Sequence, residues 1–174
     1  MTALETLAQY GVLYPCMTFT KGDEINMKEC PFLVEASDEK ALATLKRIAA
    51  RIGNGATECD SDGRNRLHLA AVLASNFTNH MLLKAQEVLK QADLPLSILR
   101  PLTMQTISKA FRMSPLTSQT GPARRNDTAT IRRHEAIIDD VHLAEIYEAV
   151  TKSIMATYWG DVEGRQAVAS VKSK

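Results

Sequence analysis

The 174 residues, of which 45% are hydrophobic, can form one complete core or one domain and part of another. The 21 basic and 20 acidic residues leave a net charge of +1, which gives no electrostatic case for binding nucleic acid or an anionic membrane. The three cysteines form no Cys-x-x-Cys pair, no apolar run approaches the roughly 20 residues of a membrane helix, and the N-terminus lacks the basic-then-apolar pattern of a secretion signal. We therefore expect a soluble, cytoplasmic protein.

The first sixty residues combine short strands with one helix, as in an α/β domain. Apolar runs predict strands at 11–19, 32–36 and 56–60. A polar loop is expected to follow the first of these strands. Ser37 is the expected N-cap of the intervening helix, and Gly53 its stop signal. Because so small a sheet normally needs further strands and helices on both faces, we expect residues 1–60 to be the tail of a larger α/β domain.

From residue 61 onward the hydrophobic pattern is helical. Asp60 or Ser61 can cap a long helix over 62–93. The rest of the pattern predicts helices at 99–113, 128–138 and 140–158, with a loop at 114–127. We expect residues 61–158 to form an all-helical domain and residues 159–174 to be a mobile tail.

The long helix carries a polar stripe among small and aliphatic residues, which predicts a buried helix that lines a cleft or an interface. At helical spacing His68, Ser75 and Asn79 share one side, and Asn76 and His80 lie beside them. Asn76, Asn79 and His80 are the candidate catalytic residues, because amides and an imidazole can orient a polar substrate or relay a proton. The alternative is that they hydrogen-bond to a neighbouring helix or a second subunit. His68, flanked by leucines, is expected to be a core or interface histidine.

The loop before Asp127 is a candidate substrate or interface loop. Gly121 allows a close backbone approach, and Gln119, Thr120 and Arg125 can present donors to an anionic or carbonyl ligand. The alternative makes Asp127 the N-cap of the next helix and the arginines a solvated rim. The capping role of Asp127 and a binding role of Gln119 are compatible with each other.

Tyr14 and Pro15 end the first predicted strand. Because ligands of open α/β sheets collect outside the carboxyl ends of strands, these two residues are candidates for cofactor binding. An ordinary strand-to-loop turn is the alternative.

The remaining histidines suggest no site of their own. The segment Arg132-Arg133-His134 is expected to be a solvated helix face. The histidines His80, His134 and His142 lack the spacing of metal ligands, so no metal site is predicted.

Three motifs in this order, Gly11-Val12-Leu13-Tyr14-Pro15, Ser75-Asn76-Phe77-Thr78-Asn79-His80 and Gln119-Thr120-Gly121-Pro122-Ala123, resemble a family of Rossmann-like bacterial proteins with a C-terminal helical domain of unknown function. The resemblance covers about residues 10–155. The family is similar in layout to pyrroline-5-carboxylate reductase and the deazaflavin-dependent NADP reductases. The resemblance implies an NADP or NAD cofactor. It also implies a helical domain that dimerises and helps to close the active site.

One departure from that layout concerns the nucleotide. A dinucleotide-binding half opens with Gly-x-Gly-x-x-Gly, and the eight glycines of this chain include no such spacing. We therefore expect residues 1–60 to be the C-terminal part of a Rossmann-like domain that lacks its nucleotide-binding part. The chain alone is then expected to bind no cofactor and to be inactive.

The resemblance leads to two functional hypotheses. In the first, the chain is the C-terminal part of an NAD(P)-dependent oxidoreductase and supplies its helical dimerisation and substrate-side domain, as a homodimer that acts on a small molecule. Tyr14 and Pro15 would lie near the nicotinamide, and Asn76, Asn79 and His80 would line the cleft. In the second, the chain is a non-catalytic helical assembly module that dimerises through its long helix.

Overall fold

The computed structural model describes residues 6–22 and 24–160, which fall into two compact units, Met1–His80 and Met81–Lys174. We call these the N-terminal unit and the helical unit. A small sheet is followed by helices, which confirms the predicted fold class, whereas the domain boundary at residue 60 stays a prediction. Of the predicted mobile tail, all but Trp159 and Gly160 lies outside the described residues. No helix in the described ranges is long and apolar enough to cross a membrane.

The N-terminal unit is built on a three-stranded sheet with the order β1-β2-β3. Its elements are β1 (Gly11–Pro15), η2 (Met27–Glu29), β2 (Phe32–Ala36), α1 (Glu39–Ile52), β3 (Ala56–Glu58), α2 (Ser61–Ala71) and η3 (Val72–Asn76). β1 pairs antiparallel with β2, and β2 pairs parallel with β3. The strand predicted at 32–36 is confirmed, and the other two are shorter than predicted.

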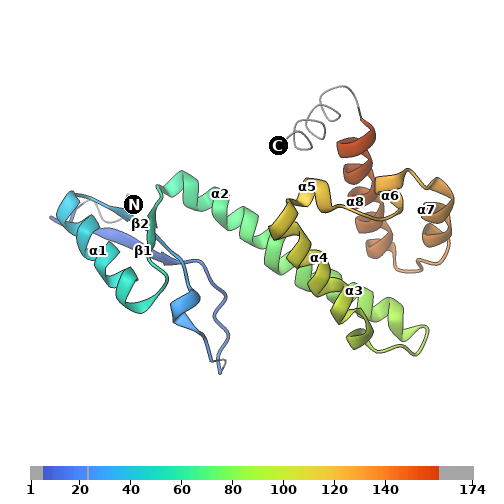
Figure 1. The fold of residues 1–174 in the computed structure, drawn as a ribbon, viewed down its shortest axis with the longest axis horizontal. Coiled ribbons are helices and arrows are strands. Elements are labelled where there is room, and N and C mark those ends of the chain that lie inside the picture. Colours follow the sequence, from blue (N-terminus) through green and yellow to red (C-terminus); the bar gives the residue numbers. More distant parts are fainter. Residues whose placement is uncertain (1–5, 23, 161–174) are drawn as a thin grey trace. The chain divides into compact units, whose positions relative to one another are not determined.

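Helix α1 covers one face of this sheet (Figure 1). Phe32 and Val34 point to that face and are 3% and 0% exposed. Phe32 packs with Cys30 and with Ala49 of α1, which are both fully buried. Burial raises the pKa of the Cys30 thiol. The core of this unit therefore lies between α1 and one face of the sheet.

Of the two predicted end signals of α1, the N-cap was wrong and the stop signal was correct. Asp38, not Ser37, caps the helix, and its carboxylate accepts the N–H of Ala41 at 2.8 Å. That contact holds the pKa of Asp38 below its usual range. Ser37 instead accepts the N–H of Tyr10 at 3.0 Å, which ties the start of β1 to the end of β2. Gly53 ends the helix as predicted.

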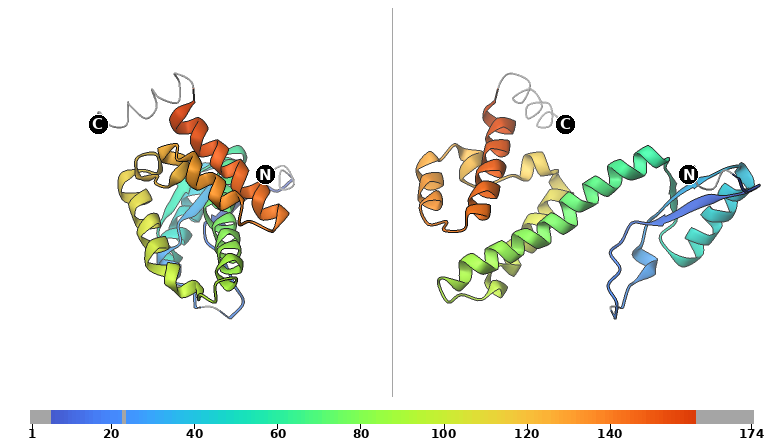
Figure 2. Two further views of the ribbon diagram at one scale, coloured as in Figure 1. Left: turned by 90° about the vertical axis from the view of Figure 1, so that its right-hand side faces the viewer. Right: turned by 180° about the vertical axis from the view of Figure 1, so that it is seen from behind.

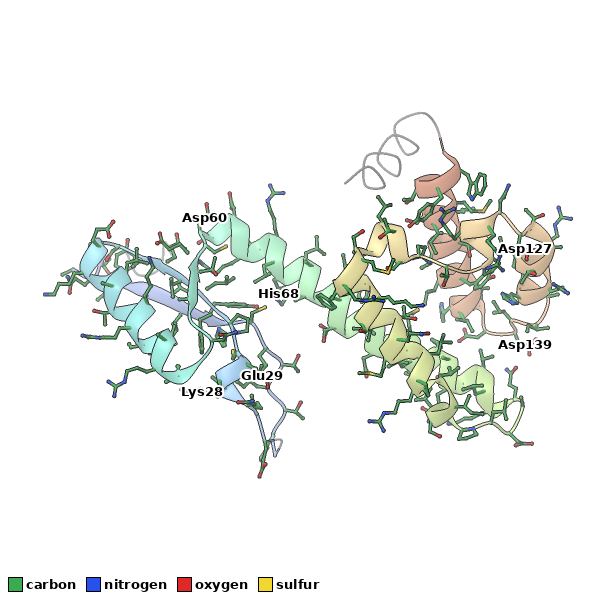
Figure 3. The ribbon with its side chains drawn as sticks, in the orientation of Figure 1. Lys28, Glu29, Asp60, His68, Asp127 and Asp139 are labelled. Carbon is green, nitrogen blue, oxygen red and sulfur yellow. The ribbon has the colours of Figure 1, made fainter. Side chains whose placement is uncertain are left out.

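The predicted long helix is present but differs in two ways from the prediction. It consists of α2, η3 and α3 (Phe77–Lys90), and η3 is a π-helical segment that sequence periodicity did not predict. Asp60 caps it by accepting the N–H of Gly63 at 2.7 Å (Figure 3). The prediction of a buried helix is wrong, because none of its described residues is buried in this chain.

A polar cluster of Glu35, Ser61 and Arg64 joins α2 to the sheet. Arg64 donates to the carboxylate of Glu35 at 2.5 Å and to Ser61 Oγ at 2.8 Å, and Ser61 Oγ lies 3.2 Å from that carboxylate. A further hydrogen bond of 2.8 Å joins Arg64 to the carbonyl of Cys59. The Arg64 and Glu35 side chains are only 13% and 23% exposed. The first turn of α2 is therefore fixed to the carboxyl ends of β2 and β3.

The helical unit contains most of α3 and the elements that follow it, namely η4 (Leu96–Leu99), α4 (Arg100–Met113), α5 (Pro115–Ser118), α6 (Pro122–Arg125), α7 (Thr128–Glu135) and α8 (Val141–Trp159). α3 and α4 diverge from the turn that joins them (Figure 2). The loop predicted at 114–127 is wrong in one respect, because it contains the short helices α5 and α6, each with a proline in its first turn.

The two last helices begin at aspartates. Asp127 caps α7 by accepting the N–H of Thr130 at 3.0 Å, as predicted, and its pKa is lowered by this contact. Asp140 caps α8 and also pairs with Lys84 of α3 at 2.6 Å. The hydrogen bond to Lys84 lowers the pKa of Asp140 and raises the pKa of Lys84. This ion pair ties α3 to the start of α8.

The Glu35–Arg64 pair should contribute measurably to stability. We expect Glu35→Gln or Arg64→Met to lower the free energy of unfolding by about 1–3 kcal/mol, because each leaves a half-buried partner without its counter-charge. The double variant should cost less than the sum of the two single variants. Chemical denaturation measures all three.

The exposed pair of Lys46 and Glu58, whose side chains are 44% and 59% exposed, is the matched control. Its coupling energy should be within about 1 kcal/mol of zero. An equally small coupling between Glu35 and Arg64 would contradict their role as an anchor.

The Lys84–Asp140 pair predicts a pH dependence of stability. Since the pKa of Asp140 is lowered by folding, its carboxylate stabilises the fold above its unfolded pKa of about 3.9, and this contribution disappears as the pH falls through the lower folded value. Lys84 has a raised pKa, so its contribution persists until the pH exceeds about 10.4.

Asp140→Asn keeps a residue that can cap α8 but removes the charge. We expect it to be less stable than the wild type at neutral pH. The difference should begin to shrink below about pH 4 and disappear once the pH has fallen through the lowered pKa of Asp140 in the folded state. Glu148→Gln, in an exposed pair with Lys152, is the control and should change little. A difference for Asp140→Asn that is constant with pH would rule out the ion pair as its cause.

Candidate functional site

The first candidate group lies where His68 of α2 comes near Tyr14 of β1. One turn after Arg64, His68 Nδ1 lies 3.5 Å from the hydroxyl of Tyr14, at the outer limit of a hydrogen bond. Tyr14 pairs with Leu33 of β2, two residues before Glu35, so Tyr14 and Glu35 belong to the same sheet face. The anchor at Glu35 therefore brings His68 to Tyr14. His68 was predicted to be a core or interface histidine; the core position is wrong, because this side chain is exposed, and the interface position stays a prediction.

Tyr14 and Pro15 do not lie at the carboxyl ends of the neighbouring strands, where they were expected. β1 runs antiparallel to β2, and Pro15 pairs with Phe32, the first residue of β2. Tyr14 therefore lies at the amino ends of β2 and β3, so the rule about the carboxyl ends of strands does not apply to it. What the structure adds is the partner His68. The cofactor role of Tyr14 and Pro15 stays a prediction.

The π-helical segment η3 changes which polar residues share one side of the long helix. Three α-helical turns take about 11 residues, which would align His68 with Asn79. A π turn adds a residue, so His80 takes that position instead. Such segments occur often at functional sites. The polar stripe is therefore arranged differently from the one that regular periodicity predicted.

The three predicted catalytic residues are accessible. Asn76 ends η3, Asn79 and His80 follow in α3, and all three are exposed. Within the described part of the chain, their side chains make no hydrogen bond or ion pair. Their amide and imidazole groups are thus free to meet a ligand or a second molecule. Their catalytic role stays a prediction.

The second candidate group is the loop that precedes α6. Gln119 donates to the carbonyl of Thr120 at 3.0 Å, and Gly121 has a φ of 104°, a conformation that favours glycine. Arg125 is 63% exposed, and its guanidinium lies 3.9 Å from the carboxylate of Asp127. Thr120 and Gly121 line a cavity of about 290 Å³ within the helical unit, whereas Gln119 and Arg125 do not.

The same cavity contains two polar residues that the sequence did not reveal. His134 Nδ1 lies 2.9 Å from the hydroxyl of Tyr147, and the rings meet edge to face at 76°. The prediction of a solvated face at Arg132-Arg133-His134 is therefore wrong for His134, which is half-buried. The two residues belong to α7 and α8, which are packed by tertiary contacts, so no local pattern joins them.

Four of the described helices have N-termini that do not fit a nucleotide pyrophosphate. That group binds at a helix N-terminus with free backbone N–H groups. The N-termini of α1, α2, α7 and α8 instead hold the carboxylates of Asp38, Asp60, Asp127 and Asp140, each of which accepts a backbone N–H. These carboxylates would repel a phosphate. In the described ranges no three His, Cys, Asp or Glu side chains gather as they would around a metal ion.

Two solved structures share the fold of this chain. The crystal structure of "putative NADP oxidoreductase BF3122" from Bacteroides fragilis has 42% sequence identity and a TM-score of 0.82, over 89% of this chain and 61% of that one. The structure of protein TM1727 from Thermotoga maritima has 22% identity and a TM-score of 0.67, over 94% of this chain and 63% of that one. The chain thus spans less than two thirds of the length of either protein. No curated protein matches it.

A family model shows where the chain belongs. The model of a domain of unknown function, DUF2520, matches residues 30–154, which include β2, all of the long helix and most of α8. The matched segment also contains Asn76, Asn79, His80 and the loop before α6. The chain is therefore a member of the DUF2520 family, as the resemblance of its motifs to proteins with a helical domain of unknown function indicated.

Proposed function

We propose that this chain supplies the helical, substrate-side part of an NAD(P)-dependent oxidoreductase. The observation that carries the proposal is its 42% identity, over 89% of its length, to the Bacteroides fragilis protein named "putative NADP oxidoreductase BF3122". The chain spans 61% of that protein, so a nucleotide-binding part is expected to come from sequence outside the matched region. The absence of Gly-x-Gly-x-x-Gly and the aspartate-capped helices support this division of roles.

In this proposal, the polar residues of the N-terminal unit handle the substrate. A nicotinamide cofactor supplies the hydride chemistry, so the protein contributes binding, orientation and proton handling. His80 and Asn76 present an imidazole and an amide to solvent, and the hydroxyl of Tyr14 meets the imidazole of His68. These groups can orient a polar substrate and hold a proton near it. Tyr14 and Pro15 would be the residues nearest to the nicotinamide.

A homodimer is part of the proposal, and exposed apolar residues on the long helix support it. Leu69, Leu73 and Phe77 follow one another at one-turn intervals and are 61%, 54% and 54% exposed. Apolar surface of this kind usually marks an interaction site. In the second hypothesis, a non-catalytic assembly module, the same surface forms the dimer and the polar stripe takes part in the interface.

Replacing Asn79 and His80 together by alanine separates the two hypotheses. If these residues are reserved for a substrate, the dimer dissociation constant measured by sedimentation should change less than about 2-fold. If they are part of the interface, the dimer should weaken by more than about 10-fold, because buried amides lose their partners.

Leu73→Glu tests the proposed interface, and Ile137→Glu is its matched control. Leu73 lies in the proposed interface, whereas Ile137 is 64% exposed and follows α7, outside the long helix. We expect Leu73→Glu to give monomers and Ile137→Glu to leave the dimer intact. A wild-type chain that is monomeric at all accessible concentrations would contradict the dimer itself.

A further inference from the structure

The cavity in the helical unit has an apolar wall made by one face of α8. Leu143, Ile146, Val150 and Ile154 recur at spacings of three and four residues, so they project from the same side of this helix. Met81 of α3 adds a flexible thioether to the lining. The volume of about 290 Å³ lies just below the range for small-molecule sites, about 300–1,000 Å³, and so suits a small ligand.

One polar cluster interrupts this apolar lining. His134 Nδ1 lies 2.9 Å from the hydroxyl of Tyr147, and Thr151, one turn along α8 from Tyr147, lines the same cavity. Burial raises the pKa of Tyr147, so its hydroxyl stays protonated. When His134 Nδ1 carries a proton and donates to this hydroxyl, the hydroxyl can donate its own proton to a ligand. The three side chains lie together at one place in the lining, where they can meet a single polar group of a ligand.

Among the described residues, none that lines the cavity is an Asp, Glu, Lys or Arg. A charged ligand would therefore lose its hydration without gaining a counter-ion. A neutral ligand with one hydrogen-bonding group would satisfy the polar cluster and bury the rest of its surface against α8.

The predicted loop forms another part of the lining. Gly121 has the positive φ of 104° that disfavours a side chain, and the space where a Cβ would project is empty to 4 Å. The neighbouring Thr120 is exposed, and both residues line the cavity. The loop therefore leaves open space beside the cavity rather than filling it.

We propose that this cavity is a binding site for a small, neutral molecule with an apolar body and one carbonyl or hydroxyl group, which is held by Tyr147, His134 and Thr151. The site lies wholly within the helical unit and does not depend on the oxidoreductase function proposed above. Its affinity for such a molecule should come from apolar burial, and its selectivity from the polar cluster.

Acetophenone and ethylbenzene form a matched pair of probes, because they share a skeleton and differ in the carbonyl oxygen. Binding is followed by the NMR signals of the Ile146 and Ile154 methyl groups in the full chain. We expect both probes to shift these signals, and acetophenone to bind about 3–10-fold more tightly, which corresponds to one net hydrogen bond. Equal affinities, or no shift with either probe at millimolar concentration, would overturn the proposal.

Variants test the assignment of residues. Tyr147→Phe and Thr151→Val should abolish the preference for acetophenone while ethylbenzene still binds, whereas Tyr10→Phe, in the other unit, should have no effect. Val150→Trp should fill the cavity and abolish binding of both probes; Val150 is 50% exposed, so the larger side chain can be accommodated. Circular dichroism checks that each variant is folded.

The rival occupant is an apolar side chain from a second copy of the chain. In that case the Ile146 and Ile154 signals would shift with protein concentration, and Val150→Trp would change the sedimentation of the protein. That pair of results would overturn the proposal, as would probe binding that Val150→Trp leaves unchanged.

Discussion

The half-buried ion pair between Glu35 and Arg64 is the contact on which the arrangement of the N-terminal unit depends. It fixes the first turn of α2 to the end of β2, with Ser61 and the carbonyl of Cys59 completing the donor and acceptor pattern. Because residues one turn apart on a helix share a face, the anchor at Arg64 also brings His68 to Tyr14. The position of the polar residues further along the helix follows from this start.

Local signals in the sequence predicted much of the fold. Phe32–Ala36, the stop at Gly53 and the cap at Asp127 follow from side-chain patterns within a few residues, and all are present. The choice of Asp38 over Ser37 as a cap was not predictable, because Ser37 is engaged by Tyr10, which is distant in sequence. Periodicity assumes a regular helix, so it could predict neither the π segment η3 nor the resulting alignment of His80 with His68.

The sequence predicted which residues belong to the candidate sites better than it predicted how those residues are placed. The polar residues of the long helix and the loop before α6 were found from composition and spacing, but their surroundings were not. The helix was expected to be buried, whereas Leu69, Leu73 and Phe77 are exposed together with the polar stripe. The His134–Tyr147 contact depends on the packing of α7 against α8, which no local pattern encodes. Exposed apolar residues beside free polar groups are consistent with a chain that acts together with further protein surface.

A calorimetric titration with NADPH tests the central claim most directly, which is that this chain provides the substrate side and not the nucleotide side of an oxidoreductase. The Bacteroides fragilis relative, which is longer, serves as the positive control. The account predicts saturable binding by that relative and none by this chain up to about 1 mM NADPH, because the N-termini of α1, α2, α7 and α8 already hold aspartate carboxylates. One-to-one binding by this chain at micromolar concentration would contradict the account.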